Sequence, residues 1–175
     1  MKKLFLLLAI STLFIFTSCV GPVGPPGVPG TNILGQVFEV TTNFEYFSDS
    51  GLQESLITIP NSIEVYESDV ILVYRLEKVV NGGSGGTADA WAPLPHNFFL
   101  NNGDIIQYVF NHTFFDVELL IDGNFNLQTL GSDFTDNQTF RIAIVPSEYG
   151  NSNLTMDELL YHLEMESADI EILPN

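Results

Sequence analysis

The feature that most constrains the fold is a series of short segments in which apolar and polar residues alternate. In residues 38–46, Phe38, Val40 and Phe44 fall on one face, and Glu39 and Glu45 fall on the other. Residues 115–121 repeat the pattern. A period of two predicts β-strands with one buried face and one solvated face.

Turn residues separate these segments from further short apolar ones. The other strands that we expect lie at residues 56–59, 70–74, 104–110, 140–144 and 170–172. The turn at Asp122 and Gly123 predicts a hairpin whose returning strand carries Phe125 and Leu127. About seven short strands predict an all-β fold, an antiparallel β-sandwich of the jelly-roll or immunoglobulin-like type.

One helix is expected near the C-terminus. Thr155 and Glu158 have the spacing of a capping box, in which each residue binds the backbone N–H of the other. Four apolar residues follow at helical spacing: Met156, Leu159, Leu160 and Leu163. This pattern predicts one short amphipathic helix that covers apolar surface.

The first residues have the pattern of an export signal. Lys2 and Lys3 precede an apolar run at residues 4–16, which is shorter than the roughly 20 residues that a membrane-spanning helix needs. The segment Phe16-Thr17-Ser18-Cys19 resembles the lipobox of bacterial lipoproteins. That resemblance implies a signal peptide at residues 1–18 and a lipid on the Cys19 sulfur. A secretory signal with an incidental cysteine remains the alternative.

Glycine occupies every third position of the next segment, residues 21–32. Four triplets are few for a collagen triple helix, so we expect a polyproline II spacer about 35 Å long. A homotrimer joined by these triplets, as in an adhesion or surface-layer component, remains the alternative. The predicted organisation is a lipidated cysteine and spacer at residues 19–32, then one acidic domain at residues 33–175.

The charge of the chain restricts its partners. Without residues 1–19, which contain two lysines and no acids, 3 basic and 22 acidic residues remain, a net charge of −19. Such a protein repels the phosphates of nucleic acids and the headgroups of anionic lipids. We therefore expect no nucleic-acid partner, and membrane contact through the lipid anchor alone.

Aromatic residues provide the first candidate for a ligand site. Trp91, His96, Phe98 and Phe99 lie among prolines. They predict a groove for a glycan or a protein segment. The alternative is that they pack into one end of the sandwich, since large aromatic side chains are usually buried.

Calcium is the second candidate ligand. Asp122, Asn124 and Asn126 alternate as the first ligands of a calcium loop do, and Asp133 falls at the twelfth position. Leu127, however, occupies the place of the glycine that such a loop requires. Turn formation explains the same residues without a metal, and no other cofactor is indicated.

No catalytic pattern is present in the sequence. His96, His112 and His162 are far apart and lack the spacing of a metal site. No serine lies in a nucleophile-elbow motif, and Cys19 is assigned to the lipid. We expect a binding or structural protein rather than an enzyme; a small hydrolase-like head is the remaining alternative.

Taken along its length, the chain resembles collagen-repeat-like lipoproteins of Bacteroidota, especially of flavobacteria. The segments that carry the resemblance are residues 24–27, 33–40, 66–69, 73–76 and 140–146. The resemblance implies a lipid-anchored protein of the bacterial outer membrane and no particular activity. Val20 follows Cys19 where surface-exposed lipoproteins of that phylum often carry acidic residues, which favours an orientation toward the periplasm.

Overall fold

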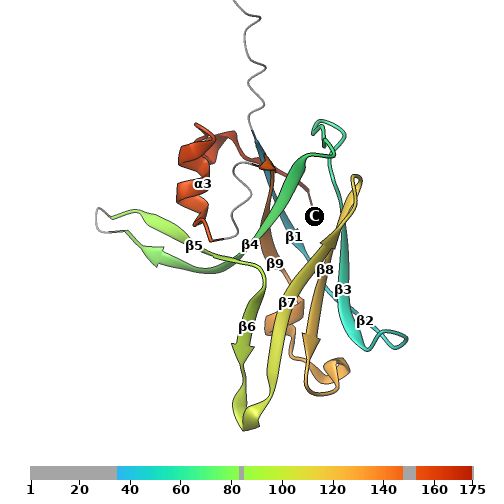
Figure 1. Ribbon diagram of the computed structural model, residues 1–175. Helices are drawn as coiled ribbons and strands as arrows, with labels where there is room; N and C mark the ends of the chain where they lie inside the picture. The colour runs from blue at the N-terminus through green and yellow to red at the C-terminus, as the bar shows by residue number, and fades with distance from the viewer. Residues whose placement is uncertain (1–34, 83–84, 148–152, 175) are drawn as a thin grey trace, which may run out of the picture. The chain divides into compact units, whose positions relative to one another are not determined.

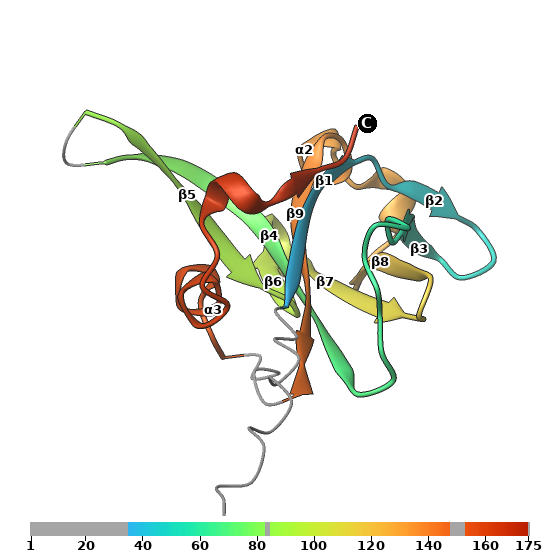
Figure 2. The ribbon, with the colours of Figure 1, turned by 90° about the horizontal axis from the view of Figure 1, so that it is seen from above.

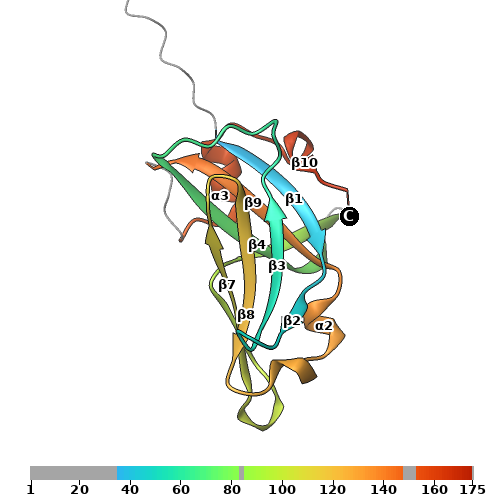
Figure 3. The same cartoon turned by 90° about the vertical axis from the view of Figure 1, so that its right-hand side faces the viewer.

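The computed structural model describes residues 35–82, 85–147 and 153–174. The leader, Cys19 and the glycine triplets lie outside the described residues. Within the unit Ile33–Asn175, the described residues form two five-stranded sheets that pack face to face (Figure 1). Figure 3 shows β3, β7 and β8 of one sheet in front of β1, β4 and β9 of the other. The predicted all-β sandwich is therefore confirmed.

The first sheet, sheet A, has the strand order β10-β1-β9-β4-β5. Its strands are β1 (Gln36–Thr42), β4 (Asp69–Asn81), β5 (Thr87–Pro93), β9 (Gln138–Pro146) and β10 (Glu171–Ile172). All neighbours are antiparallel except β1 and β10, which are parallel. The predicted strands at residues 70–74, 140–144 and 170–172 belong to this sheet.

The second sheet, sheet B, has the order β2-β3-β8-β7-β6 and is antiparallel throughout. Its strands are β2 (Glu45–Phe47), β3 (Leu52–Thr58), β6 (His96–Phe99), β7 (Ile105–His112) and β8 (Asp116–Gly123). The alternating residues Val117, Leu119 and Ile121 of β8 are at most 1% exposed. They belong to the same apolar cluster as Phe38 and Phe140, so this face of β8 is directed toward sheet A.

Helical segments connect and cover the sheets. They are η1 (Asn101–Gly103), η2 (Leu127–Thr129), α2 (Ser132–Thr135), α3 (Met156–His162) and η4 (Ser167–Asp169). The predicted capping box is present at the start of α3, where the Thr155 hydroxyl accepts from Glu158 N and the Glu158 carboxylate accepts from Thr155 N.

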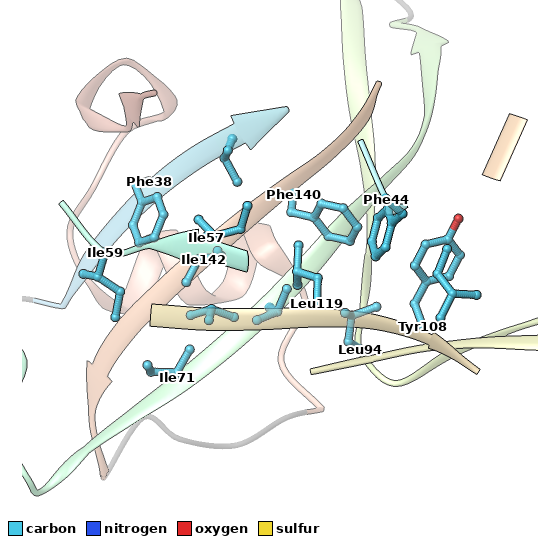
Figure 4. Packing of buried hydrophobic residues seen from close by; sticks show 14 of the residues in the cluster. Phe38, Phe44, Ile57, Ile59, Ile71, Leu94, Tyr108, Leu119, Phe140 and Ile142 are labelled. Carbon is cyan, nitrogen blue, oxygen red and sulfur yellow. The ribbon is translucent and has the colours of Figure 1, made fainter. Parts of the chain in front are cut away.

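The inner core lies between the two sheets and joins apolar side chains of both (Figure 4). Phe38, Phe140 and Ile142 of sheet A meet Leu119 and Tyr108 of sheet B, and each is at most 1% exposed. Fully burying one such side chain contributes about 1.5–3 kcal/mol to folding. With no cysteine among residues 35–175, this packing holds the domain together without disulfides.

The outer core lies on the other face of sheet A, beneath α3 (Figure 2). Met156 and Leu159 of α3 and its C-cap residue Leu163 are at most 2% exposed, and they belong to one cluster with Val37 and Val145 of the sheet. The apolar stripe predicted for this helix thus covers sheet A. This cover explains why the first half of β4 is apolar without alternation: its two faces contribute to two cores.

One predicted strand was wrong in its extent. Residues 38–46 form two strands, because β1 ends in sheet A and β2 begins in sheet B. Asn43 and Phe44 make the crossing: the Asn43 side chain accepts from Asn137 N at 2.7 Å, and Phe44 N donates to Thr135 O at 2.8 Å. The alternation persists across the break because both sheets bury the same inner core.

The predicted hairpin after Gly123 was also wrong. Leu127 begins the short helix η2, capped by the Asn126 side chain, instead of lying on a returning strand. The neighbours of β8 are β3 and β7, which come earlier in the chain. Leu127 is 1% exposed and enters the inner core from the end of the sandwich.

Candidate functional site

The four aromatic candidates do not form one groove. Trp91 of β5 lies on the outer face of sheet A, where the Arg141 guanidinium is 4.1 Å from its ring centroid. Phe98 and His96 of β6 turn toward the inner core, with Phe98 5.7 Å from the Tyr108 ring. Phe99 is 79% exposed and points away from Phe98. The four residues are separated because β5 and β6 belong to different sheets. Phe98 therefore fits the alternative interpretation, in which the aromatic side chain packs into the sandwich.

Three of the four calcium candidates accept hydrogen bonds from backbone N–H groups. Asn124 Oδ1 accepts from Ile105 N at 2.8 Å, and Asn126 Oδ1 accepts from Gln128 N at 3.1 Å. Asp122 Oδ1 accepts from Gly123 N at 2.7 Å, while Asp133 lies in the first turn of α2. No group of three or more His, Cys, Asp and Glu side chains placed to hold a metal occurs within the described ranges. Calcium binding at these residues stays a prediction, and turn formation accounts for the same residues equally well without a metal.

The three histidines lie on separate elements. His96 is on β6, His112 ends β7 with its ring 6.3 Å from that of Phe110, and His162 ends α3. Cys19, the predicted lipidation site, lies outside the described residues. In the described part of the chain, no helix has the length and apolar character needed to cross a bilayer.

A groove of about 290 Å³ opens beside the first half of β4, and we call it the β4 groove. Residues 70–74 of β4, residues 93–95 after β5 and Phe110 of β7 line it. These side chains are apolar apart from the Tyr74 hydroxyl, which donates to Leu154 O at 3.0 Å. The β4 groove therefore offers apolar contact and no ionisable side chain other than this tyrosine.

The backbone beside the β4 groove is an open sheet edge. β4 pairs with β9 along residues 69–75, but it pairs with β5 only from Tyr74 onward. Leu94 N donates to Val73 O at 2.9 Å, so the backbone of Val73 points away from β9. Because backbone groups alternate in direction along an antiparallel strand, the N–H and C=O of Ile71 point the same way. Neither group has a strand partner among the described residues.

The passage of the chain from sheet A to sheet B explains why the edge is open. β5 ends at Pro93, and the chain then passes through Leu94 and Pro95 into β6 of the opposite sheet. In the register of β4 and β5 the residue opposite Ile71 would be His96, which instead pairs with Tyr108 of β7 in sheet B. The first half of β4 is consequently left as an edge strand next to an apolar opening.

We expect the Ile71 amide to exchange with deuterium roughly tenfold or more faster than the Leu72 amide, because unpaired amides need no strand opening to exchange. Leu72 is opposite Ala143 of β9 and directs its N–H into that ladder. Residue-resolved hydrogen exchange by NMR measures both in one sample. Equal, slow exchange would show that another part of the chain pairs with this edge.

A second groove, of about 440 Å³, lies on the outer face of sheet B. Glu45, Glu54 and Glu118 line it together with Phe47 and Leu56. Glu45 and Glu54 are directly opposite each other on β2 and β3, where like charges repel. No lysine or arginine belongs to this lining, so an anionic ligand is disfavoured at this face.

A buried cation lies between the two sheets near the start of β6. The Arg75 side chain donates from Nε to Gln138 Oε1 at 3.1 Å, and its guanidinium lies 4.8 Å from the Tyr108 ring centroid. The one ion pair formed among the described residues joins Arg141 and Glu39 instead. Burial raises the pKa of Tyr108 to about 12, although the positive charge of Arg75 acts in the opposite direction.

The β4 groove and the open edge were not predicted from the sequence. Two signals bear on it: β4 has 13 residues and extends well beyond the expected residues 70–74, and prolines follow in the sequence at positions 93 and 95. Strand partners depend on contacts between distant segments, however, so these signals could not identify which edge stays open.

Comparison of the chain with protein-family models, with curated proteins and with solved structures finds no match.

Proposed function

We propose that this chain is a lipid-anchored protein of the bacterial cell envelope whose sandwich domain binds a partner in the β4 groove. The tether in this proposal is Cys19, which ends a lipobox-like segment after a short apolar leader. Several acyl chains on this residue would hold the protein on a membrane, at about 0.8 kcal/mol per buried methylene.

The observation that carries the binding role is the combination of an apolar groove with a strand edge that no described residue pairs with at Ile71. Clefts with mostly apolar walls and a few directed polar groups are the usual form of ligand sites. In the β4 groove the directed polar groups are backbone N–H and C=O of β4. The groove lining contains no acid, histidine, lysine, serine or cysteine, which supports binding rather than catalysis.

The tether is tested by replacing Cys19 with alanine. We expect wild-type protein from membranes to carry the mass of acyl groups on residue 19 and to incorporate labelled palmitate. The Cys19→Ala protein should incorporate no label, because no thiol is present to accept the lipid. Intact-mass analysis and labelling measure both.

The matched control is Ser18→Ala, which keeps a small residue before the cysteine and should leave lipidation unchanged. Wild-type protein with a free Cys19 thiol, or with residues 1–18 still attached, would contradict the proposed anchor.

A further inference from the structure

We infer that the ligand of the β4 groove is an extended polypeptide segment from a partner protein, which pairs with the backbone of Ile71 at the edge of sheet A. This inference rests on the proposed function, since it names the ligand class of the same groove. It depends on backbone positions rather than on any one side chain.

The spacing of the outward-directed backbone groups fits a strand. Asp69, Ile71 and Val73 are two residues apart, so their outward groups repeat every ~6.8 Å along β4. Val73 O already accepts from Leu94 N, and Asp69 N donates to Tyr66 O at 3.0 Å. The Ile71 N–H and C=O between them form one donor–acceptor pair, which an opposing strand residue matches with two hydrogen bonds.

Burial makes pairing of this backbone favourable. Ile71 is only 4% exposed, and its outward backbone groups face the β4 groove, from which a bound ligand would exclude water. A buried polar group without a partner costs about 1–3 kcal/mol. A glycan or an acyl chain would fill apolar space without offering the regular alternation of donors and acceptors that this edge requires. An extended peptide supplies both.

The groove walls predict the side chains of that peptide. A strand added to sheet A directs every second residue toward the inner core. On that side Leu94 and Phe110 line the β4 groove. Those positions should be aliphatic or aromatic. The intervening residues point outward, and basic ones are favoured because the chain has 22 acidic residues against 5 basic ones.

The test uses the full chain, purified in detergent, and a pool of octapeptides. The peptides carry Val, Leu, Ile or Phe at alternate positions, with Thr, Ser or Lys between them. Peptides retained by the protein are identified, resynthesised, and compared with versions N-methylated at alternate residues. N-methylation removes backbone donors and keeps the side chains. We expect a loss of affinity of tenfold or more for the N-methylated forms, and slower exchange of the Ile71 amide on binding.

Phe110→Ala should weaken binding roughly fivefold or more, because it removes the groove wall contributed by sheet B. The matched control is Phe99→Ala, which removes an exposed ring of the neighbouring strand β6 outside the groove and should leave affinity unchanged.

The outcomes separate the two proposals. If N-methylation has no effect but Phe110→Ala weakens binding, the β4 groove binds peptides by side chains alone and strand addition is wrong. If peptides bind and neither Phe110→Ala nor Ile71 exchange responds, the site lies elsewhere and both proposals fail. Retention of no peptide from the pool would also overturn strand addition.

Discussion

Replacing Gln138 with leucine is expected to lower the free energy of unfolding by about 3–5 kcal/mol, because it leaves a buried guanidinium without its acceptor. Arg75 and Gln138 are 8% and 7% exposed, and Nε and Nη2 of Arg75 both donate to Gln138 Oε1. The Gln138 amide nitrogen also donates to Asp133 O at 3.1 Å and Asp136 O at 2.7 Å. One substitution therefore removes partners from one charge and two carbonyl groups.

The second variant, Gln138→Leu combined with Arg75→Met, identifies the cause. Methionine fills similar space without a charge, so the double variant should recover roughly 1–2 kcal/mol relative to Gln138→Leu alone. Gln107→Leu is the matched control, since that side chain bonds the exposed Asn97 and its loss should cost under about 0.5 kcal/mol. Equilibrium urea unfolding measures all of these variants. A Gln138→Leu protein as stable as wild type would show that solvent, rather than Gln138, satisfies Arg75.

The elements that local chemistry determines were predictable from the sequence. The helix α3 begins where the Thr155 capping box places it, and its apolar residues face sheet A as their spacing requires. The strands β8 and β9 show the expected alternation or apolar character, because each pairs on both sides and buries a face. The capping box and the spacing of apolar residues each depend on residues that are close to one another in the sequence.

The sheet to which each strand belongs was not predictable in the same way. A period of two places Phe38 and Phe44 on one face, and it is satisfied equally by one strand or by two strands that face a common core. The aromatic residues around Pro93 show the same limit. Trp91 and Phe98 are seven positions apart in the sequence, but the crossing between sheets sends them to different cores.

The proposed ligand site follows from this crossing. Had β5 continued along β4, Ile71 would be paired and the β4 groove would be filled by a strand of the domain itself. The end of β5 at Pro93 instead lets the chain enter sheet B as β6, and it leaves Ile71 without a strand partner among the described residues. Exposed strand edges invite pairing with other chains, and proteins usually cover or charge them. Here residues 70–73 carry no charge, and no described strand pairs with the outward groups of Ile71.

Raising the pH from 10 to 12 is expected to destabilise the domain, because two buried tyrosines must stay neutral in the folded state. Burial raises the pKa of Tyr108 to about 12. Burial, followed by the negative charge of Glu158, raises the pKa of Tyr74 to about 12. The hydroxyls donate to Phe134 O at 2.6 Å and Leu154 O at 3.0 Å, and a phenolate would lose this bond.

The direction follows from proton linkage. In the unfolded chain these tyrosines ionise near pH 10, so the unfolded state releases protons first as the pH rises. The stabilisation is complete below pH 10 and is lost as the pH approaches 12, by roughly 2 kcal/mol for Tyr108 at pH 12.

Tyr108→Phe should be less stable than wild type at pH 8 by about 1 kcal/mol, since it loses one hydrogen bond. It should also lose less stability between pH 10 and 12. Tyr161→Phe, which alters a ring that is 81% exposed, is the control and should follow the wild-type pH profile. Urea unfolding at pH 8, 10, 11 and 12 tests this, and a Tyr108→Phe profile parallel to that of wild type would show that Tyr108 ionises without opposing the fold.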